Sequence, residues 1–298
     1  MIQRRIASSL AMFLAVMLAC GCDRTPAPAS EVVGTSAPRV ASLSPAATDI
    51  VVAMQLAGQL IAVSNFEPPR KITDHLPRAG DYRSVDWELL AVLKPDVIVT
   101  QYHADKMPEG FADRAAALNI KMFNRKIDSL KDTRLAIAEL GTVLDAKSEA
   151  DLTVNRWDDA LSQVRTFAES YPKRGVLLVV GESGLNAVGP GTFLGELLEI
   201  AGGVNVIPVG VDYPTLDRER LAALDPDVII QLLPGASTQS IEYAKSFWPT
   251  MSELRAVKQS QVFWVTDPDV LLPGFCATQT AERLAAILHG SHPTTRPN

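Results

Sequence analysis

Two glutamates in matching surroundings are the first candidates for chemistry in this 298-residue chain. The segment Glu88–Ile98 recurs 131 residues later as Glu219–Ile229, with eight of eleven positions identical. Each copy has a tyrosine six residues before its glutamate, Tyr82 and Tyr213. A carboxylate can bind a cation through charge-assisted hydrogen bonds, and a tyrosine ring offers an apolar face. The repeat therefore predicts two related lobes, each carrying an acid and an aromatic residue.

Further aromatic residues stand where α/β sheets bind ligands. Phe66 and Tyr102 each follow an expected strand, and ligands of such sheets bind beyond the carboxyl ends of the strands. We therefore expect Phe66, Tyr82, Tyr102 and Tyr213 to line a ligand cleft between the two lobes. Flat aromatic walls suit a large planar ligand or a chelate. The alternative is that one or two of these tyrosines are half-buried surface residues.

Other kinds of chemistry have less support in the sequence. A net charge of −6 provides no basic field for nucleic acid. No glycine-rich nucleotide motif follows the first strand and no base–nucleophile pair is evident, so we expect no enzyme, catalytic residue or cofactor. A receptor for bare zinc or manganese needs three or four converging ligands, and His75 and His103 have no obvious partners. We read Cys276, the one cysteine after Cys22, as a small buried residue.

The N-terminus has the features of a targeting segment. Arg4 and Arg5 precede an apolar run at 6–19, which is too short for a comfortable membrane span. Small residues before Cys20 and Cys22 resemble the lipobox of bacterial lipoproteins, in which the cysteine is lipidated. We predict a signal peptide with a lipobox at 1–22, and a disordered tether rich in Pro, Ala, Ser and Thr at 23–39. An ordinary cleaved signal peptide or an uncleaved anchor is the alternative.

The rest of the chain alternates between strand and helix patterns, which predicts an α/β fold. We expect an N-terminal α/β lobe at 40–145, a linking helix at 146–172 and a C-terminal α/β lobe at 173–298. Turn residues are almost absent from 130–171, which predicts a helix, a break near Gly141 and a long second helix. That long helix could join the lobes or pack within one of them. The expected strands are 40–43, 60–64, 97–100, 121–123, 176–180, 228–232 and 262–265, and the expected shorter helices begin at 45, 85, 111, 193, 219 and 278.

Several motifs in this order resemble the substrate-binding proteins of ABC importers that carry cobalamin, ferric siderophores and haem. The motifs are Val40–Thr48, Leu93–Ile98, Gly189–Leu194, Ala201–Gly203 and Leu224–Ile229. The resemblance implies two Rossmann-like lobes joined by a single long α-helix, with a ligand cleft between the lobes. It also implies that the lobes move little about the hinge and that the protein is a monomer. We expect the protein in the periplasm or at the cell surface, anchored to the membrane by lipid.

The resemblance also assigns roles to individual residues. Glu88 and Glu219 match the glutamates that dock into arginine pockets of the permease dimer. The alternative is that both are ordinary exposed acids near a helix start. Tyr82 and Tyr213, like Tyr102, match aromatic positions that pack on the corrin of a cobalamin-binding relative, and Asp267 matches an acid that contacts the ligand there.

The resemblance favours capture of a large metal chelate and its delivery to the permease. The family motif often contains an arginine where this chain has Phe275, so an anionic ferric siderophore loses a cationic partner. We therefore rank a corrinoid first, a ferric siderophore second and haem third, and His103 could contact a haem or a metal. A haem or bare-metal receptor, and less favourably a two-lobe enzyme, are the alternative functions.

Overall fold

The computed structural model describes residues 37–290 except Gly184. The expected signal peptide and its two cysteines lie outside the described residues, as does most of the expected tether. Arg39 belongs to the folded body, because its backbone N–H donates to Asp96 Oδ2 at 2.8 Å. The first lobe therefore begins slightly before the expected boundary at Val40. Within the described residues, no helix is long and apolar enough to span a membrane.

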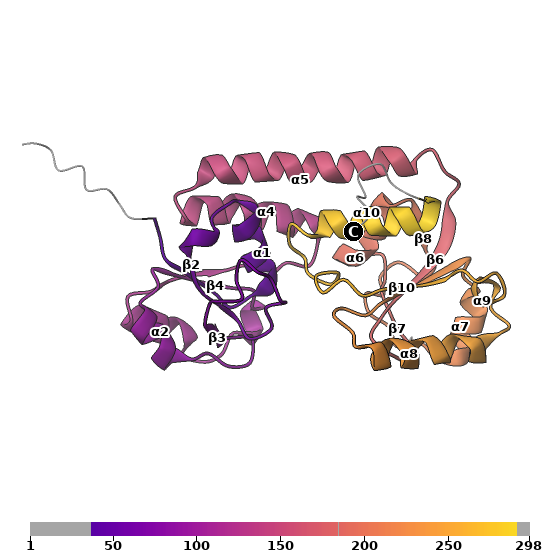
Figure 1. The fold of residues 1–298 in the computed structure, drawn as a ribbon, viewed down its shortest axis with the longest axis horizontal. Coiled ribbons are helices and arrows are strands. Elements are labelled where there is room, and N and C mark those ends of the chain that lie inside the picture. Colours follow the sequence, from indigo (N-terminus) through magenta and orange to yellow (C-terminus); the bar gives the residue numbers. More distant parts are fainter. Residues whose placement is uncertain (1–36, 184, 291–298) are drawn as a thin grey trace, which may run out of the picture. The chain divides into compact units, whose positions relative to one another are not determined.

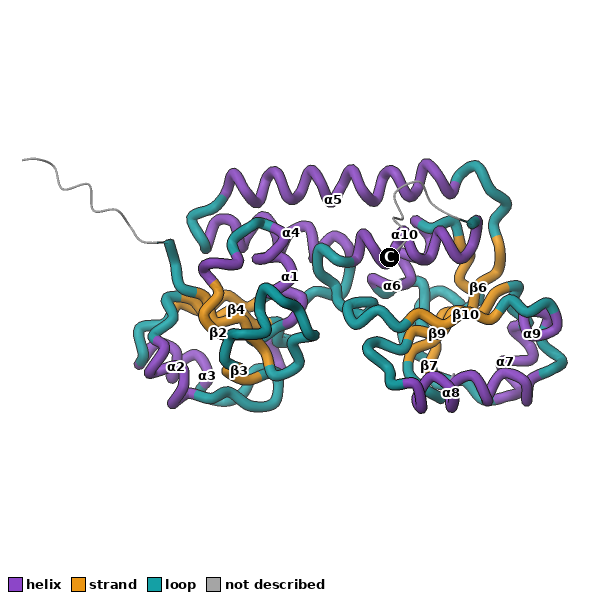
Figure 2. The backbone as a smooth tube through the Cα atoms, viewed as in Figure 1, coloured by secondary structure: helices purple, strands orange, loops and turns teal. Residues whose placement is uncertain are grey.

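The first lobe is a parallel five-stranded sheet with strand order β3-β2-β1-β4-β5, flanked by helices (Figures 1 and 2). The central strands β1 and β4 are buried at every position, and β4 consists entirely of β-branched residues, which accounts for its clear sequence signal. The elements are β1 (Val40–Ser42), α1 (Pro45–Ala53), β2 (Leu60–Ser64), β3 (Arg78–Gly80), α2 (Trp87–Leu93), β4 (Val97–Thr100), α3 (Phe111–Ala117) and β5 (Lys121–Asn124), with 3₁₀ turns at Ala57–Gln59 and Ala104–Lys106.

The second lobe contains another five-stranded sheet, in which β10, β9 and β6 lie side by side and both β7 and β8 pair with β6. All of its pairings are parallel except β6 with β7. Its elements are β6 (Arg174–Val180), β7 (Asn186–Ala187), α6 (Phe193–Ile200), β8 (Gly203–Asn205), α7 (Arg218–Leu224), β9 (Val228–Leu232), α8 (Thr238–Phe247), a 3₁₀ turn (Trp248–Met251), α9 (Arg255–Lys258), β10 (Val262–Val265) and α10 (Ala277–His289).

Two helices, α4 (Leu130–Val143) and α5 (Lys147–Ala168), lie between the lobes in the sequence. The expected break near Gly141 begins three residues later, at Leu144, because the helix continues through this glycine to Val143. A Cβ atom on Gly141 would lie 2.2 Å from the Cβ of Ala150. The glycine therefore allows α4 and α5 to pack closely, and the chain turns three residues later.

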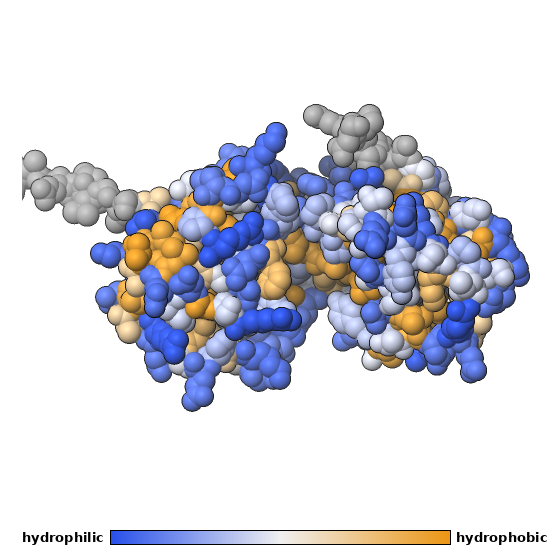
Figure 3. All heavy atoms as spheres, turned by 60° about the horizontal axis from the view of Figure 1, so that its bottom comes forward, coloured by the Kyte–Doolittle hydropathy of each residue, from blue (hydrophilic) through white to orange (hydrophobic). Residues whose placement is uncertain are grey.

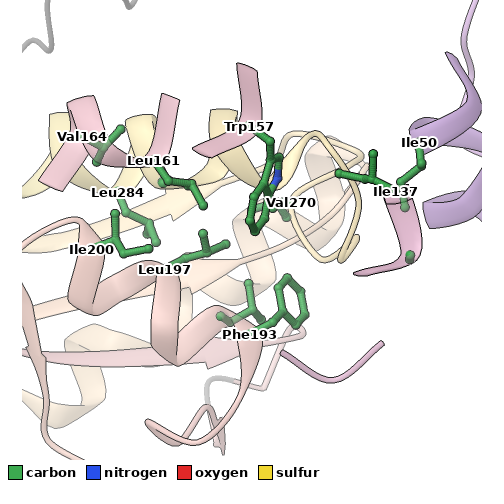
Figure 4. Packing of buried hydrophobic residues seen from close by; sticks show 14 of the residues in the cluster. Ile50, Ile137, Trp157, Leu161, Val164, Phe193, Leu197, Ile200, Val270 and Leu284 are labelled. Atoms are coloured by element: carbon green, nitrogen blue, oxygen red, sulfur yellow. The ribbon is translucent and has the colours of Figure 1, made fainter. Parts of the chain in front are cut away.

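The long helix α5 joins the two lobes, as the resemblance implied. One face of α5 is buried, and along it the helix packs first against α4 and then against α6 and α10 of the second lobe (Figure 1). Figure 4 shows Trp157, Leu161 and Val164 of α5 directed toward the buried side chains of α6 and α10. One apolar cluster includes these residues together with Ile50 and Ile137 of the first lobe. A shared core of this kind makes the pair of lobes stiff relative to lobes joined by loops alone.

The sequence repeat has a structural basis in its Pro-Asp corner. Asp96 Oδ2 accepts the Arg39 N–H beside β1, and Asp227 Oδ2 accepts the Gly175 N–H of β6 at 2.9 Å. Just before each corner, Lys94 (φ 49°) and Asp225 (φ 35°) end their helices in the left-handed conformation. In both lobes, therefore, the repeated aspartate ties the end of a helix to the start of a central strand.

Candidate functional site: an aromatic cavity at the strand ends

The carboxyl ends of β1, β2 and β4 surround a cavity of about 350 Å³ in the first lobe. Strand β1 lies between β2 and β4, so the helical connections on its two sides diverge at this point. Such a point leaves a crevice beyond the strand ends, where open α/β sheets bind ligands. The lining residues are Leu43, Ser44, Pro45, Ser64, Phe66, Tyr82, Thr100, Gln101 and Tyr102.

Phe66 and Tyr82 form the exposed aromatic part of this cavity. Their rings stack with centroids 5.6 Å apart and planes inclined by 22°. Both remain more than half exposed, at 54% and 59%. The Arg83 guanidinium lies 5.2 Å from the centre of the Tyr82 ring, and its Nε donates to the Tyr82 hydroxyl at 3.0 Å. Two apolar rings left open beside a cavity can cover a flat ligand.

Tyr102 is placed differently from the other predicted aromatics. It is only 6% exposed, and its hydroxyl donates to the Asp81 carbonyl at 3.0 Å. Its ring meets Phe111 edge-on at 5.4 Å. Burial, and then the Asp81 charge, raise the pKa of Tyr102. Tyr102 therefore forms part of the cavity wall and carries little free face for stacking, and its contact with a ligand stays a prediction.

The loop that presents Tyr82 is fixed by Asp81. The Asp81 carboxylate accepts hydrogen bonds from the backbone N–H groups of Arg83 and Ser84 and from the Asn65 side chain. Burial opposes its charge, but these hydrogen bonds, the Arg83 amide first, keep the pKa of Asp81 below its ordinary value. The three hydrogen bonds to the Asp81 carboxylate therefore fix this loop, which packing of the exposed Tyr82 ring alone would hold less firmly.

A second cavity, of about 330 Å³, adjoins the first and shares Tyr82, Gln101 and Tyr102 with it. Its other lining residues are His103, Lys106, Lys126, Ile127 and Asp128. Lys106 forms an ion pair with Asp105 and Lys126 with Asp128, so the two lysines here are balanced by neighbouring acids, and His103 also contacts Asp105. Together the two cavities offer a larger ligand both aromatic faces and a polar rim.

Tyr213 of the second lobe lies close to this rim. Partial burial raises its pKa, against a hydrogen bond with Thr192, and the carboxylates of Asp212 and Asp128 raise it further. The Asp128 carbonyl also accepts the N–H of Phe193, at the start of α6, at 3.1 Å. Tyr213 is 58% exposed and lines neither of the two cavities, so the second lobe adds an open ring on the side of Asp128.

Asp267 is not grouped with these aromatic residues. It is exposed, forms an ion pair with Arg283 at 3.4 Å, and lines a separate cavity along β10 and α10. None of the four predicted aromatics lines that cavity. Its contact with a ligand remains a prediction from the resemblance alone.

Glu88 and Glu219 occupy equivalent positions on the two lobes. Each lies exposed in the first turn of a seven-residue helix, α2 or α7, two residues after the aspartate that caps it. The caps are Asp86 and Asp217, whose carboxylates accept the N–H groups of Leu89 and Arg220. Neither glutamate forms an ion pair within the described part of the chain, so both carboxylates are available to a partner.

Sequence reasoning missed two polar residues of the aromatic cavity. Ser44 caps α1 and donates its hydroxyl to Gln101 Oε1 at 2.5 Å. Gln101 Nε2 has no hydrogen-bond partner among the described residues. Both directly follow the ends of strands, which is the same signal that selected Phe66 and Tyr102. Across residues 37–290, excluding Gly184, no group of three His, Cys, Asp or Glu side chains is arranged to hold a metal ion.

Comparison with known proteins identifies the family of this fold. The family model for periplasmic binding proteins matches residues 40–268, which is more than three quarters of the chain. The chain belongs to the periplasmic binding protein family. Proteins of this family bind substrates for ABC importers. The periplasmic-binding-protein assignment confirms the predicted α/β fold, with two Rossmann-like lobes joined by a single long helix and a cleft between them. A groove between the lobes, with apolar residues within it, is visible in Figure 3.

Three relatives of known name illustrate the similarity. A vitamin B12-binding protein of Yersinia pseudotuberculosis serotype O:3 (strain YPIII) is 26% identical over 255 residues, covering 85% of this chain and 88% of the relative. The periplasmic vitamin B12-binding protein of Vibrio cholerae superposes with a TM-score of 0.69 at 23% identity, covering 85% of this chain and 96% of the other. A periplasmic heme-binding protein of Pseudomonas aeruginosa superposes with a TM-score of 0.72 at 21% identity, covering 88% and 95%.

Proposed function

We propose that this periplasmic binding protein captures a bulky metal chelate and delivers it to a membrane permease. The observation that carries the proposal is the stacked, half-exposed pair Phe66 and Tyr82 at the ends of the first-lobe strands. Rings presented in this way cover a flat or rounded organic surface, whereas a bare metal ion needs converging oxygen, nitrogen or sulfur ligands. A corrinoid is the favoured ligand, followed by a ferric siderophore and then haem.

Two further observations support an organic chelate. Tyr213 adds an open ring from the second lobe, so a ligand that extends from the second cavity past Asp128 toward that lobe meets a further aromatic face. The unpartnered Gln101 amide and the Ser44 hydroxyl add hydrogen-bonding groups of the kind that ligand amides and carboxylates use. Among the named relatives, two bind vitamin B12, which agrees with the preference for a corrinoid.

Delivery of the ligand rests on Glu88 and Glu219 in this proposal. One free carboxylate on each lobe suits a permease dimer with one basic pocket in each subunit. The resemblance supplies that partner, and the exposed position of both side chains in capped helices supports it.

We further propose that Cys20 or Cys22 carries lipid, which would keep the receptor beside the permease. Mass spectrometry of the membrane fraction tests this, and a mature protein that lacks lipid at both cysteines contradicts it.

Calorimetric titration tests the ligand proposal. The protein is titrated with cyanocobalamin, a ferric catecholate, a ferric hydroxamate, haem and zinc. We expect tight binding of cyanocobalamin and weak or no binding of zinc. Tight binding of a ferric siderophore or haem without cyanocobalamin would reverse the order of ligands but keep the receptor. Binding of zinc alone, or of none of these, would refute the proposed function.

A further inference from the structure

A buried charge cluster joins the two lobes, and none of its residues lines the aromatic cavity, although Glu67 directly follows Phe66 in the sequence. Its centre is Arg70, in the loop between β2 and β3, whose side chain is 14% exposed. Arg70 Nη1 lies 2.7 Å from Asp49 Oδ1 of α1, and its Nη2 lies 2.8 Å from Asp269 Oδ1 of the second lobe. One guanidinium thus binds a carboxylate of its own lobe and a carboxylate of the other.

Asp49 makes a second contact across the same interface. Its Oδ2 accepts the backbone N–H of Cys276, next to the start of α10, at 2.8 Å. A Cβ atom on Gly274 would lie 2.5 Å from this oxygen, so the second-lobe loop passes directly over the carboxylate. The loop from Asp269 to Cys276 is therefore held to the first lobe by polar contacts at both of its ends.

Glu67 is the third carboxylate of the cluster, and it is incompletely paired. Its side chain is 1% exposed, and neither carboxyl oxygen has a hydrogen-bond partner among the described residues. Its closest cation is Arg70, whose Nε lies 3.6 Å from Oε1. Arg78 of β3 is also near, but its Nη1 is bonded to the carbonyls of Ser64 and Glu67.

The surroundings of Glu67 favour its neutral form. Burial raises the pKa of Glu67 from 4.5 to about 7, against the lowering effects of Arg70, of a contact with the Thr48 hydroxyl and of Arg78. Asp269, facing it from the second lobe, raises the pKa further. Asp49 on α1 and the buried Cys276 thiol complete the ionisable groups around the cluster.

We propose that this cluster is a proton-dependent latch between the lobes, in which Arg70 and Asp269 form the crosslink and Glu67 binds the proton. With Glu67 neutral, the guanidinium is shared only by Asp49 and Asp269. An ionised Glu67 competes for Arg70 and repels Asp269, the most exposed of the three carboxylates at 34%. Loss of the proton therefore weakens the crosslink and frees the loop that covers Asp49.

Hydrogen exchange on the ligand-free full-length protein tests the latch without reference to any ligand. The readout is exchange of the Cys276 amide, which bonds to Asp49 across the interface. Wild type is compared with Glu67→Gln at the same pH, so the intrinsic pH dependence of exchange cancels. We expect the ratio of exchange in wild type to exchange in Glu67→Gln to be larger at pH 8 than at pH 5.5 by on the order of tenfold, because Glu67 loses its proton in the closed latch only between these two pH values. A proton bound more tightly in one state changes the equilibrium by up to one decade for each pH unit between the two pKa values.

Two further variants separate the latch from a general effect on folding. Asp269→Asn removes the crosslink, so the Cys276 amide of this variant should exchange fast at both pH values. The ratio of its exchange rate to that of Glu67→Gln should no longer depend on pH. Asp267→Asn is the matched control, because this carboxylate lies two residues away and pairs with Arg283 outside the cluster. It should keep the wild-type pH profile. A wild-type to Glu67→Gln ratio that is the same at pH 5.5 and pH 8 would overturn the proposal.

Discussion

Replacing Tyr82 with alanine should weaken ligand binding by ten- to a hundredfold. The ring is 59% exposed, and one of its faces already stacks on Phe66. A ligand can therefore cover about half of the exposed part, or roughly 60 Å² of a tyrosine that buries about 200 Å² in full. At about 25 cal/mol per Å² this area contributes about 1.5 kcal/mol, and aromatic stacking adds about 0.5–1.5 kcal/mol. Since 1.4 kcal/mol is one decade in Kd, the expected loss follows.

Calorimetry on folded protein measures this loss, with Tyr243→Ala as the matched control. Tyr243 lies on α8, is 61% exposed, and lines neither cavity of the candidate site. The control should bind with the wild-type Kd, and both variants should unfold at the wild-type temperature within a few degrees. An unchanged Kd for Tyr82→Ala, or an equal loss in the control, would refute the assignment of this ring to the site.

Three other perturbations have defined outcomes. Glu88→Ala with Glu219→Ala should leave the Kd for the chelate unchanged and abolish uptake in a transport assay; a weaker Kd would instead place these acids at the ligand. Gly141→Ala should destabilise the protein by about 1–3 kcal/mol in urea unfolding, because the new methyl group collides with Ala150, and an unchanged midpoint would contradict that packing. The Gly175 hydrogen bond, together with Arg255, lowers the pKa of Asp227 below 3.8, so this carboxylate stabilises the fold above that pH. Asp227→Asn should therefore be less stable than wild type at pH 7, with the difference shrinking as pH falls below about 4, and a constant difference would argue against ionisation.

The central strands and most helices could be predicted because the pattern of apolar residues in their sequences matches the residues that the fold buries. The strands at Val97–Thr100 and Val228–Leu232 are buried at every position, and all of their residues except Gln231 are apolar or β-branched. Strands β3, β7 and β8 contain only two or three residues and carry no periodic pattern. Helix α8 was also missed, because its apolar stripe is short, with Ile241 and Phe247 only partly buried and Ala244 its one buried residue.

The candidate site was predicted in part, for a related reason. Position after a strand located Phe66 and Tyr102, and position before the repeated helix located Tyr82; all three line one cavity. It could not indicate that the Tyr102 hydroxyl turns inward to the Asp81 carbonyl, because that contact joins segments 21 residues apart. The charge cluster around Arg70 was invisible for the same reason, since Asp269 lies 199 residues away in the sequence.

The crystal structure of the protein with its tightest-binding chelate is the most direct test of the central claim. We expect the chelate against the exposed faces of Phe66 and Tyr82, with carbon atoms within about 4 Å of both rings, and Tyr213 beside it. A chelate bound instead in the cavity of β10 and α10, beside Asp267, would contradict the account.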